Sequence, residues 1–204
     1  GKKTKLSKRE GTNSAEFSNG MKYFINTYSS IDTPHTVTIN DNSGKELKTL
    51  IDNKALTEKL AKFDMPSKEF FTFTTTDGVE LNGWMIKPHD FDANKKYPVV
   101  LFQYSGPYSQ QVTDNWYIGN YGNAMFESYM AGEGFIMVCV DGRGTGGRGT
   151  KFGKCTYLNI GKYEPADQVE TAKYLGTLPY VDKNNIGIWG WSFGGYNTIM
   201  SMSQ

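Results

Sequence analysis

The hydrophobic pattern divides the 204-residue chain into two parts. Residues 1–52 hold short stretches of alternating polar and apolar residues between turn sequences, a pattern typical of antiparallel strands. From Pro98 onward, continuous apolar runs alternate with helix-compatible segments, which is typical of a parallel sheet covered by helices. The pattern therefore predicts an α/β protein preceded by a small antiparallel sheet.

The first part predicts three or four strands, with a hairpin turn at Asp41–Gly44. Such a unit matches one blade of a β-propeller, and a lone blade would leave its faces and edges uncovered. Because the chain contains no second copy, residues 1–52 are expected to be the C-terminal part of a propeller. A small meander packed on the next domain is the alternative. The strand candidates are Ala15–Phe17, Tyr23–Tyr28, Thr36–Asn40 and Lys45–Leu50.

A connector follows. Apolar side chains recur every three or four residues in Lys54–Phe63, which predicts a short helix, and Pro66 ends it. Residues 53–69 are therefore predicted to join a first domain, residues 1–52, to a second domain, residues 70–204.

The second domain opens with a hairpin around Asp77-Gly78 and continues as alternating strands and helices. Right-handed crossovers would place the functional side chains at the carboxyl ends of the parallel strands. On the last long helix, Val169, Ala172 and Leu175 are expected to face the sheet. The predicted elements are strands at Phe70–Thr75, Val79–Lys87, Val99–Phe102, Phe135–Val140 and Ile186–Trp189, and helices at Asn123–Ala131, Pro165–Leu175 and Tyr196–Met202.

Composition excludes several classes of function. The formal net charge is +1, and the basic start of the chain is short, so neither nucleic acid nor an anionic membrane is an expected partner. No apolar run approaches the ~20 residues that a spanning helix needs. The two cysteines, Cys139 and Cys155, have no metal-ligand spacing, so no metal and no cofactor is expected. Cys139 lies in an apolar run and is expected to be buried.

The strongest chemical signal is Gly-x-Ser-x-Gly at Gly190, Ser192 and Gly194, between a strand-like run and a helix-compatible run. This context predicts a nucleophile elbow, in which the serine occupies a strained turn and the flanking side chains must be absent. Trp191 and a further glycine, Gly195, complete the predicted elbow. The alternative is a glycine-rich turn that carries a surface serine.

Acyl transfer at Ser192 would also need donors for an oxyanion. The backbone N–H of Phe193 is one candidate, because it belongs to the residue after the nucleophile. Tyr104 is the other: it follows the first buried strand, and its phenol can donate a hydrogen bond. An aromatic side chain packed under the Gly106-Pro107 turn is an equally good interpretation of Tyr104 from the residues alone.

The glycine-rich stretch Asp141–Gly149 could be mistaken for a phosphate-binding loop. It lacks a Lys-Ser/Thr pair after its glycines, and no helix is expected directly behind it, so nucleotide binding is rejected. The favoured interpretation is an active-site loop formed by Asp141 and its neighbours, with Arg143 paired to a carboxylate. A flexible turn is the alternative.

A serine nucleophile needs a general base and an orienting acid. The chain has two histidines, His35 and His89, and both precede Ser192, whereas α/β-hydrolases have the order Ser, acid, His. No Asp, Glu or His occurs in Phe193–Gln204. The triad acid and base are therefore expected outside this chain, both of whose ends are interpreted as incomplete.

Three motifs in this order resemble the dipeptidyl peptidase IV group of the prolyl oligopeptidase family, bacterial members above all. They are Tyr104-Ser105-Gly106-Pro107, Asp141-Gly142-Arg143-Gly144 and the elbow Gly190–Tyr196. The resemblance covers nearly the whole chain. It implies a β-propeller followed by an α/β-hydrolase domain, and a serine exopeptidase that releases dipeptides with Pro or Ala second from peptides with a free N-terminus. It also implies export to the periplasm or cell surface, a homodimer, and no cofactor.

The resemblance assigns the nucleophile to Ser192 and an oxyanion-hole hydroxyl to Tyr104. Phe193 stands where the family often has tyrosine, and the backbone N–H survives this change. The paired glutamates that hold the substrate amino terminus have no match, since the chain contains no Glu-Glu. An acylaminoacyl peptidase or esterase on the same scaffold, or a non-catalytic interaction module, are the alternatives.

Overall fold

The computed structural model describes residues 2–63, 65–116 and 123–204, and these form two compact units. Unit 1 comprises residues 1–65 and 113–124, and unit 2 comprises residues 66–112 and 125–204. The predicted connector, residues 53–69, includes residue 64, which lies outside the described residues. The assignment of residues 113–124 to unit 1 was not predicted from the sequence pattern.

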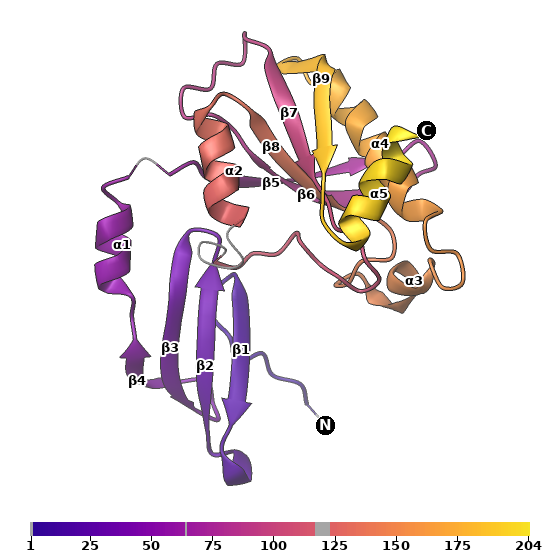
Figure 1. The fold of residues 1–204 in the computed structure, drawn as a ribbon. Coiled ribbons are helices and arrows are strands. Elements are labelled where there is room, and N and C mark those ends of the chain that lie inside the picture. Colours follow the sequence, from indigo (N-terminus) through magenta and orange to yellow (C-terminus); the bar gives the residue numbers. More distant parts are fainter. Residues whose placement is uncertain (1, 64, 117–122) are drawn as a thin grey trace. The chain divides into compact units, whose positions relative to one another are not determined.

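Unit 1 is a four-stranded antiparallel sheet with the order β1-β2-β3-β4 (Figure 1). The turn between β3 and β4 is closed by the Asp41 carboxylate, which accepts the backbone N–H groups of Ser43 and Lys45 at 2.9 and 3.0 Å. Gly44 completes this turn with φ +84°, a conformation that glycine adopts without strain. The predicted strands are thus confirmed. The elements are β1 (Thr12–Phe17), a 3-10 turn (Asn19–Met21), β2 (Tyr23–Ser30), β3 (Thr33–Asp41), β4 (Glu46–Ile51) and α1 (Lys54–Leu60).

Residues 113–116 return to unit 1 through hydrogen bonds. Asp114 accepts the hydroxyl of Thr12 on its carbonyl oxygen at 2.7 Å and the N–H of Ile31 on its carboxylate at 2.9 Å. The N–H of Trp116 donates to the hydroxyl of Ser29 at 3.1 Å. These partners are polar groups far apart in the chain, so no hydrophobic periodicity marks the segment.

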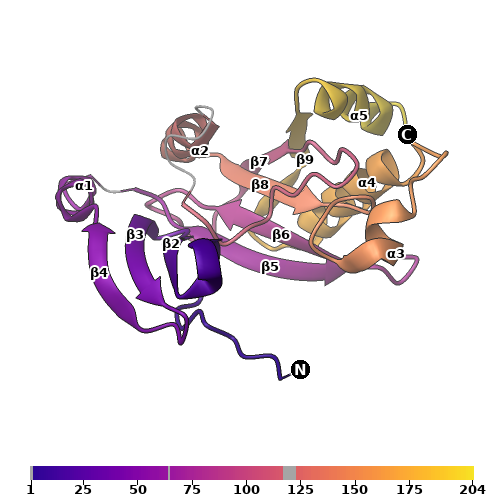
Figure 2. The same cartoon turned by 90° about the horizontal axis from the view of Figure 1, so that it is seen from below.

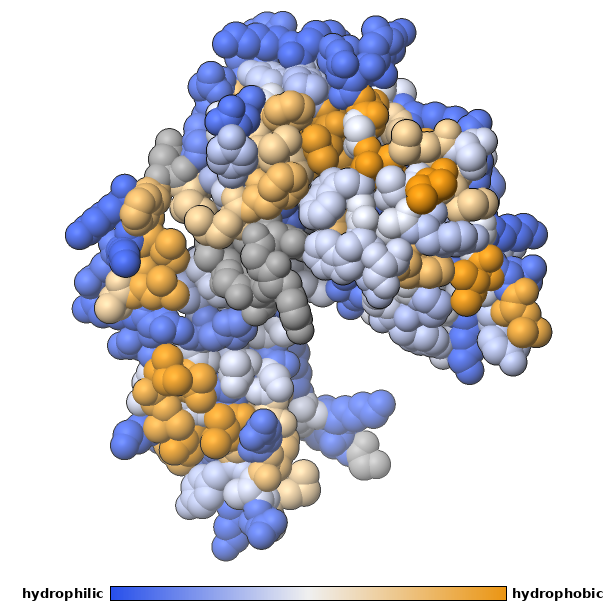
Figure 3. Space-filling model, viewed as in Figure 1, coloured by the Kyte–Doolittle hydropathy of each residue, from blue (hydrophilic) through white to orange (hydrophobic). Residues whose placement is uncertain are grey.

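One face of the unit 1 sheet carries a group of paired apolar residues. Ile25 pairs with Ile39 on the next strand, and Val37 pairs with Ile51. Side chains of directly paired residues lie on the same face of a sheet. Figure 3 shows apolar side chains gathered over these strands, where Ile25 is 40% exposed and Ile51 is 49% exposed.

Unit 2 contains a five-stranded mixed sheet with the order β5-β6-β8-β7-β9. Strands β7, β8 and β9 are parallel, whereas the β5–β6 hairpin joins them antiparallel through β6 and β8. The predicted α/β class is therefore present, but the sheet is mixed, because the hairpin is part of it. Its strands are β5 (Lys68–Thr74), β6 (Glu80–Ile86), β7 (Tyr97–Phe102), β8 (Ile136–Asp141) and β9 (Val181–Trp189).

Helices cover both faces of this sheet (Figures 1 and 2). On one face, Ala131 of α2 packs in a cluster with Phe102 and Met137. On the other, Leu175 of α4 packs with Leu101 and Val138. Neighbouring strand residues thus face opposite helices, as expected for strands buried on both sides, and Cys139 is fully buried as predicted. The helices are α2 (Asn123–Gly132), α3 (Gly149–Lys154), α4 (Tyr163–Thr177) and α5 (Phe193–Met202).

The buried face of α4 differs from the predicted one. Leu175 is fully buried, but Val169 and Ala172 are only half-buried. The inward side is instead largely polar: Gln168 donates to the Val140 carbonyl oxygen on β8, and Asp167 accepts from Arg143 in the loop after β8. The fully or almost fully buried polar residues of α4 are Glu164, Asp167, Gln168 and Thr171.

Candidate active site

The carboxyl ends of three parallel strands lie side by side in unit 2. Phe102 at the end of β7 is in register with Cys139 on β8 and with Trp189 on β9. The segments after these strands, which carry Tyr104, Arg143 and Ser192, therefore leave the sheet at one edge. This is the edge at which parallel α/β sheets place their functional groups.

Ser192 forms a strained turn between β9 and α5. Its backbone has φ 53° and ψ −124°, and it is the N-cap residue of α5. A non-glycine residue at positive φ costs on the order of 1–3 kcal/mol, and such strain gathers at functional sites. The Ser192 side chain is exposed. Phe193 is the first helical residue, so its N–H has no acceptor within the helix and is available to a negative charge.

The glycines of the elbow are required by close backbone contacts. A Cβ on Gly194 would lie 2.5 Å from the carbonyl oxygen of Gln103, and a Cβ on Gly190 would collide with the same oxygen. A Cβ on Gly195 would lie 3.3 Å from the carbonyl oxygen of Gly190. The elbow therefore packs directly on the end of β7, and a side chain at either flanking position would separate the two.

Tyr104 lies beside the elbow. A Cβ on Gly106 would lie 2.7 Å from Cε1 of Tyr104 and 3.6 Å from Cδ1 of Phe193, so both rings lie next to Gly106. Asn197 of α5 donates from its amide to the carbonyl oxygen of Tyr104 at 3.4 Å. The Tyr104 side chain is half-buried. The structure thus brings the phenol-bearing residue to the same edge as the serine.

Asp141 fastens the loop that follows β7. Its carboxylate is 4% exposed and accepts the backbone N–H groups of Gln111 at 3.0 Å and Val112 at 2.8 Å. Burial raises the pKa of Asp141 to about 6, against the lowering effect of these hydrogen bonds. Asp141 therefore holds the backbone of the loop after β7 in place at this edge of the sheet.

Arg143 pairs with carboxylates, chiefly that of Asp167. Its Nη2 lies 2.6 Å from Oδ1 of the fully buried Asp167, its Nε also donates there, and its Nη1 lies 2.8 Å from Oδ2 of Asp77. The backbone N–H of Arg143 donates to Asp167 as well, at 2.6 Å. The hydrogen bonds that the guanidinium donates, first to Asp167 and then to Asp77, raise the pKa of Arg143. The pairing ties the loop after β8 to α4.

The glycine-rich loop is followed directly by α3, which begins at Gly149, so the expectation that no helix starts there was wrong. Gly149 has φ +80°, and such a residue can turn the chain into a helix over one position. The loop glycines nevertheless serve packing. A Cβ on Gly144 would lie 2.7 Å from Cγ2 of Thr156, and one on Gly146 would lie 2.8 Å from the Tyr108 carbonyl oxygen.

His89, the histidine of unit 2, is not brought to the elbow. His35 belongs to β3 of unit 1, where its carbonyl oxygen accepts the Asn53 side chain at 2.5 Å. His89 follows β6, whose last residue Ile86 pairs with Met137 near the start of β8. His89 therefore leaves the sheet at the edge opposite Ser192.

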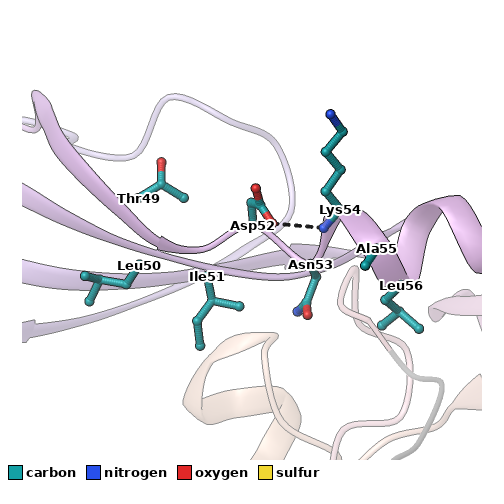
Figure 4. Close-up of a pocket in the computed structure, with 8 residues that line it drawn as sticks. All are labelled: Thr49, Leu50, Ile51, Asp52, Asn53, Lys54, Ala55 and Leu56. Carbon is teal, nitrogen blue, oxygen red and sulfur yellow. Dashed lines mark hydrogen bonds between the residues drawn. The ribbon is translucent and has the colours of Figure 1, made fainter.

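Two hollows lie in unit 1. The larger, about 440 Å³, lies where β4 meets α1 and is lined by residues 49–56. Figure 4 shows these side chains, with the Asp52 carboxylate accepting the Lys54 N–H at 3.0 Å. The smaller, about 270 Å³, lies between residues 6–9 and the sheet.

Two further findings concern the described residues only. They include no group of three or more His, Cys, Asp or Glu side chains placed to hold a metal ion. They also include no helix that is long and apolar enough to cross a membrane.

Sequence reasoning missed the buried polar residues that brace this edge. Gln103 donates to the carbonyl oxygen of Gly194 and, at 3.2 Å, to the hydroxyl of Thr198. The sequence contained one signal for them. Each is a polar residue at a position that should be buried, either directly after a buried strand or on the side of a helix that faces the sheet. The missed residues are Gln103, Ser105, Asp167, Gln168 and Asn197.

Comparison with known proteins gives a consistent result. A family model described as the prolyl oligopeptidase family matches residues 124–204. The crystal structure of Porphyromonas gingivalis dipeptidyl peptidase 4 superposes with a TM-score of 0.92 at 50% identity, covering 98% of this chain and 28% of that one. A probable dipeptidyl-aminopeptidase B of Chaetomium globosum is 40% identical over 198 residues, or 96% of this chain and 21% of the relative. A probable dipeptidyl peptidase 4 of Aspergillus flavus is 36% identical over 188 residues, or 91% of this chain and 24% of the relative.

The chain thus spans 21 to 24% of the length of these two curated relatives. The similarity nevertheless extends along nearly all of its residues, through the elbow and the loops at the same sheet edge. The chain is therefore similar to dipeptidyl peptidases along nearly all of its length, and residues 124–204 match the family model of the prolyl oligopeptidase family.

Proposed function

We propose that these residues form part of a serine dipeptidyl peptidase in which Ser192 is the nucleophile. The observation that carries the proposal is the exposed Ser192 at φ 53° on the first position before α5. In the proposed reaction, the Ser192 hydroxyl attacks the carbonyl carbon of the second substrate residue, which forms the peptide bond to the third. An acyl-enzyme forms as the amine leaves, and water then releases the dipeptide.

The proposed oxyanion site combines the Tyr104 hydroxyl with the Phe193 N–H. The Tyr104 and Phe193 rings both lie next to Gly106, and the N–H groups at the start of α5, beside Ser192, have no acceptor within the helix. Donors fixed in advance at the place where negative charge develops are commonly the largest single contribution to such catalysis. Both donors belong to segments held by the end of β7.

The proposed domain assignment follows the two units. Unit 2 would be the first part of an α/β-hydrolase domain up to its nucleophile, and unit 1 would contain the last blade region of a propeller. The parallel β8-β7-β9 order with a nucleophile elbow after β9 supports the first assignment. The four-stranded antiparallel sheet, with apolar residues paired on one of its faces, supports the second.

The reaction needs a base and an acid that no residue after Ser192 in this sequence provides. We place both outside these residues and expect the 204-residue chain alone to be inactive. Peptides with a free N-terminus and with Pro or Ala second are the proposed substrates, and a homodimer is the proposed assembly. The names of the relatives, dipeptidyl peptidase and dipeptidyl-aminopeptidase, support this substrate class.

The test uses the polypeptide at the length of its relatives, with and without Ser192→Ala. The parent should release dipeptides from chromogenic substrates with Pro or Ala second. The variant should lose at least about 10⁴-fold in kcat. N-terminally acetylated peptides and simple esters form the second substrate panel. Preferential cleavage of acetylated substrates would favour an acylaminoacyl peptidase or esterase, and turnover by Ser192→Ala would rule out this nucleophile.

A further inference from the structure

A second strained serine lies next to the proposed oxyanion tyrosine. Ser105 has φ 54°, a conformation that is unfavourable for any residue except glycine. Its side chain is almost fully buried, at 1% exposure. The backbone turns at Ser105, directly after Tyr104. The conformation of Ser105 therefore sets the position of Gly106 against the Tyr104 ring. Strain of this kind persists only where neighbouring groups hold it.

The group that holds Ser105 is Gln168 of α4. The Gln168 amide Nε2 donates to the Ser105 hydroxyl at 3.0 Å and to the carbonyl oxygen of Val140 at 3.2 Å. One side chain therefore bridges a helix, the end of β8 and the loop after β7. Gln168 is 1% exposed, so water does not compete for these bonds.

A buried amide at position 168 would be unfavourable if the side chain only filled space. A buried polar group is unfavourable unless it is hydrogen-bonded. The Oε1 atom of Gln168 has no hydrogen-bond partner among the described residues. A leucine would fill similar space without that cost, but it could not hold the Ser105 hydroxyl. The benefit of the glutamine therefore lies in its two hydrogen bonds, and the one to Ser105 is the bond that reaches the loop carrying Tyr104.

We propose that Gln168 is a positioning residue, which acts through Ser105 to hold Tyr104 where its hydroxyl can stabilise the oxyanion. The proposal rests on the proposed function, since it takes the Tyr104 hydroxyl as the oxyanion donor. Two other amides act on different groups nearby: Gln103 bonds to Gly194 and Thr198, and Asn197 bonds to the Tyr104 carbonyl oxygen. Gln168 alone among these three amides contacts Ser105.

The first measurement is the steady-state kinetics of Gln168→Leu in the polypeptide at the length of its relatives. A donor displaced by roughly 1 Å costs up to about 10²-fold, so kcat should fall by about tenfold to a hundredfold. KM should change by less than about twofold, because the oxyanion exists in the transition state and not in the bound substrate. A rise in KM at constant kcat would overturn the proposal.

A double-mutant cycle with Tyr104→Phe supplies the decisive comparison. Tyr104→Phe alone should lower kcat by about 10²- to 10³-fold. In that background, Gln168→Leu should change kcat by less than about twofold, because the donor to be positioned is gone. A full additional loss would overturn the positioning role alone. An unchanged kcat for Tyr104→Phe alone would overturn the proposed oxyanion role of Tyr104, and the positioning role with it.

Ser105→Gly tests the same bond with little risk to folding. Glycine adopts φ 54° freely, but it removes the hydroxyl that Gln168 contacts. We expect a kcat loss that does not add to that of Gln168→Leu, and a parent-like kcat would contradict the proposal. Thr171→Val is the matched control: among the described residues, this buried hydroxyl on the same helix bonds to the Asp167 carbonyl oxygen alone, at 2.8 Å. It should leave kcat unchanged even if the thermal midpoint falls.

Discussion

Gln103 donates a hydrogen bond from its side chain to the carbonyl oxygen of Gly194 and so joins the end of β7 to the first turn of α5. Its own carbonyl oxygen lies where a Cβ on Gly194 would approach to 2.5 Å. The elbow is therefore held against β7 by a hydrogen bond and by a backbone contact that only glycine permits. This contact explains how Ser192 keeps a positive φ on an exposed turn.

Gly194→Ala should separate the elbow from β7. Because the blocking atom belongs to the backbone, it cannot rotate away, and we expect kcat to fall by at least about 10²-fold. The matched control is Gly132→Ala, at the end of α2, where a Cβ would meet no atom within 4 Å. That change should alter the free energy of unfolding by less than about 1 kcal/mol. Peptidase kinetics and thermal unfolding of both variants test the contrast, and a parent-like Gly194→Ala would contradict it.

The buried ion pair of Lys68 and Glu127 should respond to single and double replacement in different ways. Its atoms are 3.2 Å apart, the side chains are 8% and 4% exposed, and the Lys68 ammonium lies 3.8 Å from the Trp84 ring centre. Burial lowers the pKa of Lys68 and raises that of Glu127, and each partner opposes the other's shift. Lys68→Met should cost about 3–5 kcal/mol, because it leaves a buried carboxylate unpaired.

The double variant Lys68→Met with Glu127→Leu should recover most of that loss, since no buried charge remains. Lys173→Met breaks an exposed pair with Glu170 and should cost less than about 1 kcal/mol. Denaturation midpoints of the four proteins provide the comparison. Equal losses in the single and double variants would show that the ion pair itself stabilises unit 2.

Asp141 predicts a specific pH dependence of stability. Its folded pKa of about 6 lies above the ordinary 3.8, so the folded state binds this proton more tightly than the unfolded chain. The resulting stabilisation is complete below pH 3.8 and is lost as the pH rises through about 6. Asp141→Asn has no such proton, so its stability relative to the parent should rise by roughly 2 kcal/mol from pH 4 to pH 7. Thermal unfolding across this range measures the trend.

Asp182→Asn is the control of opposite sign. Hydrogen bonds from Asn185 and Asn184 lower the pKa of the Asp182 carboxyl, so its contribution is present above the unfolded pKa and is lost as the pH falls. The Asp182 variant should therefore lose stability relative to the parent as the pH rises. A pH-independent difference for Asp141→Asn would contradict a raised pKa at that residue.

Arg143 should stabilise the fold mainly through its ion pair with Asp167 and much less through its ion pair with Asp77. Arg143→Met leaves the fully buried Asp167 carboxylate without its cation, at a cost of about 3–5 kcal/mol near neutral pH. The cost should shrink at acidic pH, where Asp167 takes up a proton. Asp77 is 53% exposed, so Asp77→Asn should cost less than about 1 kcal/mol. Thermal midpoints of both variants at pH 5 and pH 8 test this, and equal effects would contradict it.

The sequence by itself determined the features that depend on neighbouring residues. Apolar runs located β7, β8 and β9, because a strand buried on both faces must be apolar at successive positions. Gly-x-Ser-x-Gly located the turn at Ser192, because its strain and its need for glycine arise within five residues of chain. Turn residues located the hairpins at Asp41–Gly44 and Asp77-Gly78 for the same reason.

Only the tertiary structure decided which distant groups meet. Gln168 contacts Ser105 across 63 positions, and Arg143 contacts Asp167 across 24. No periodicity encodes such pairs. The apolar pattern of α4 predicted that Val169 and Ala172 face the sheet, but Asp167 and Gln168 are the residues buried there. The physical reason is that a buried polar side chain is stable only with its partner in place, and the fold supplies that partner from elsewhere in the chain.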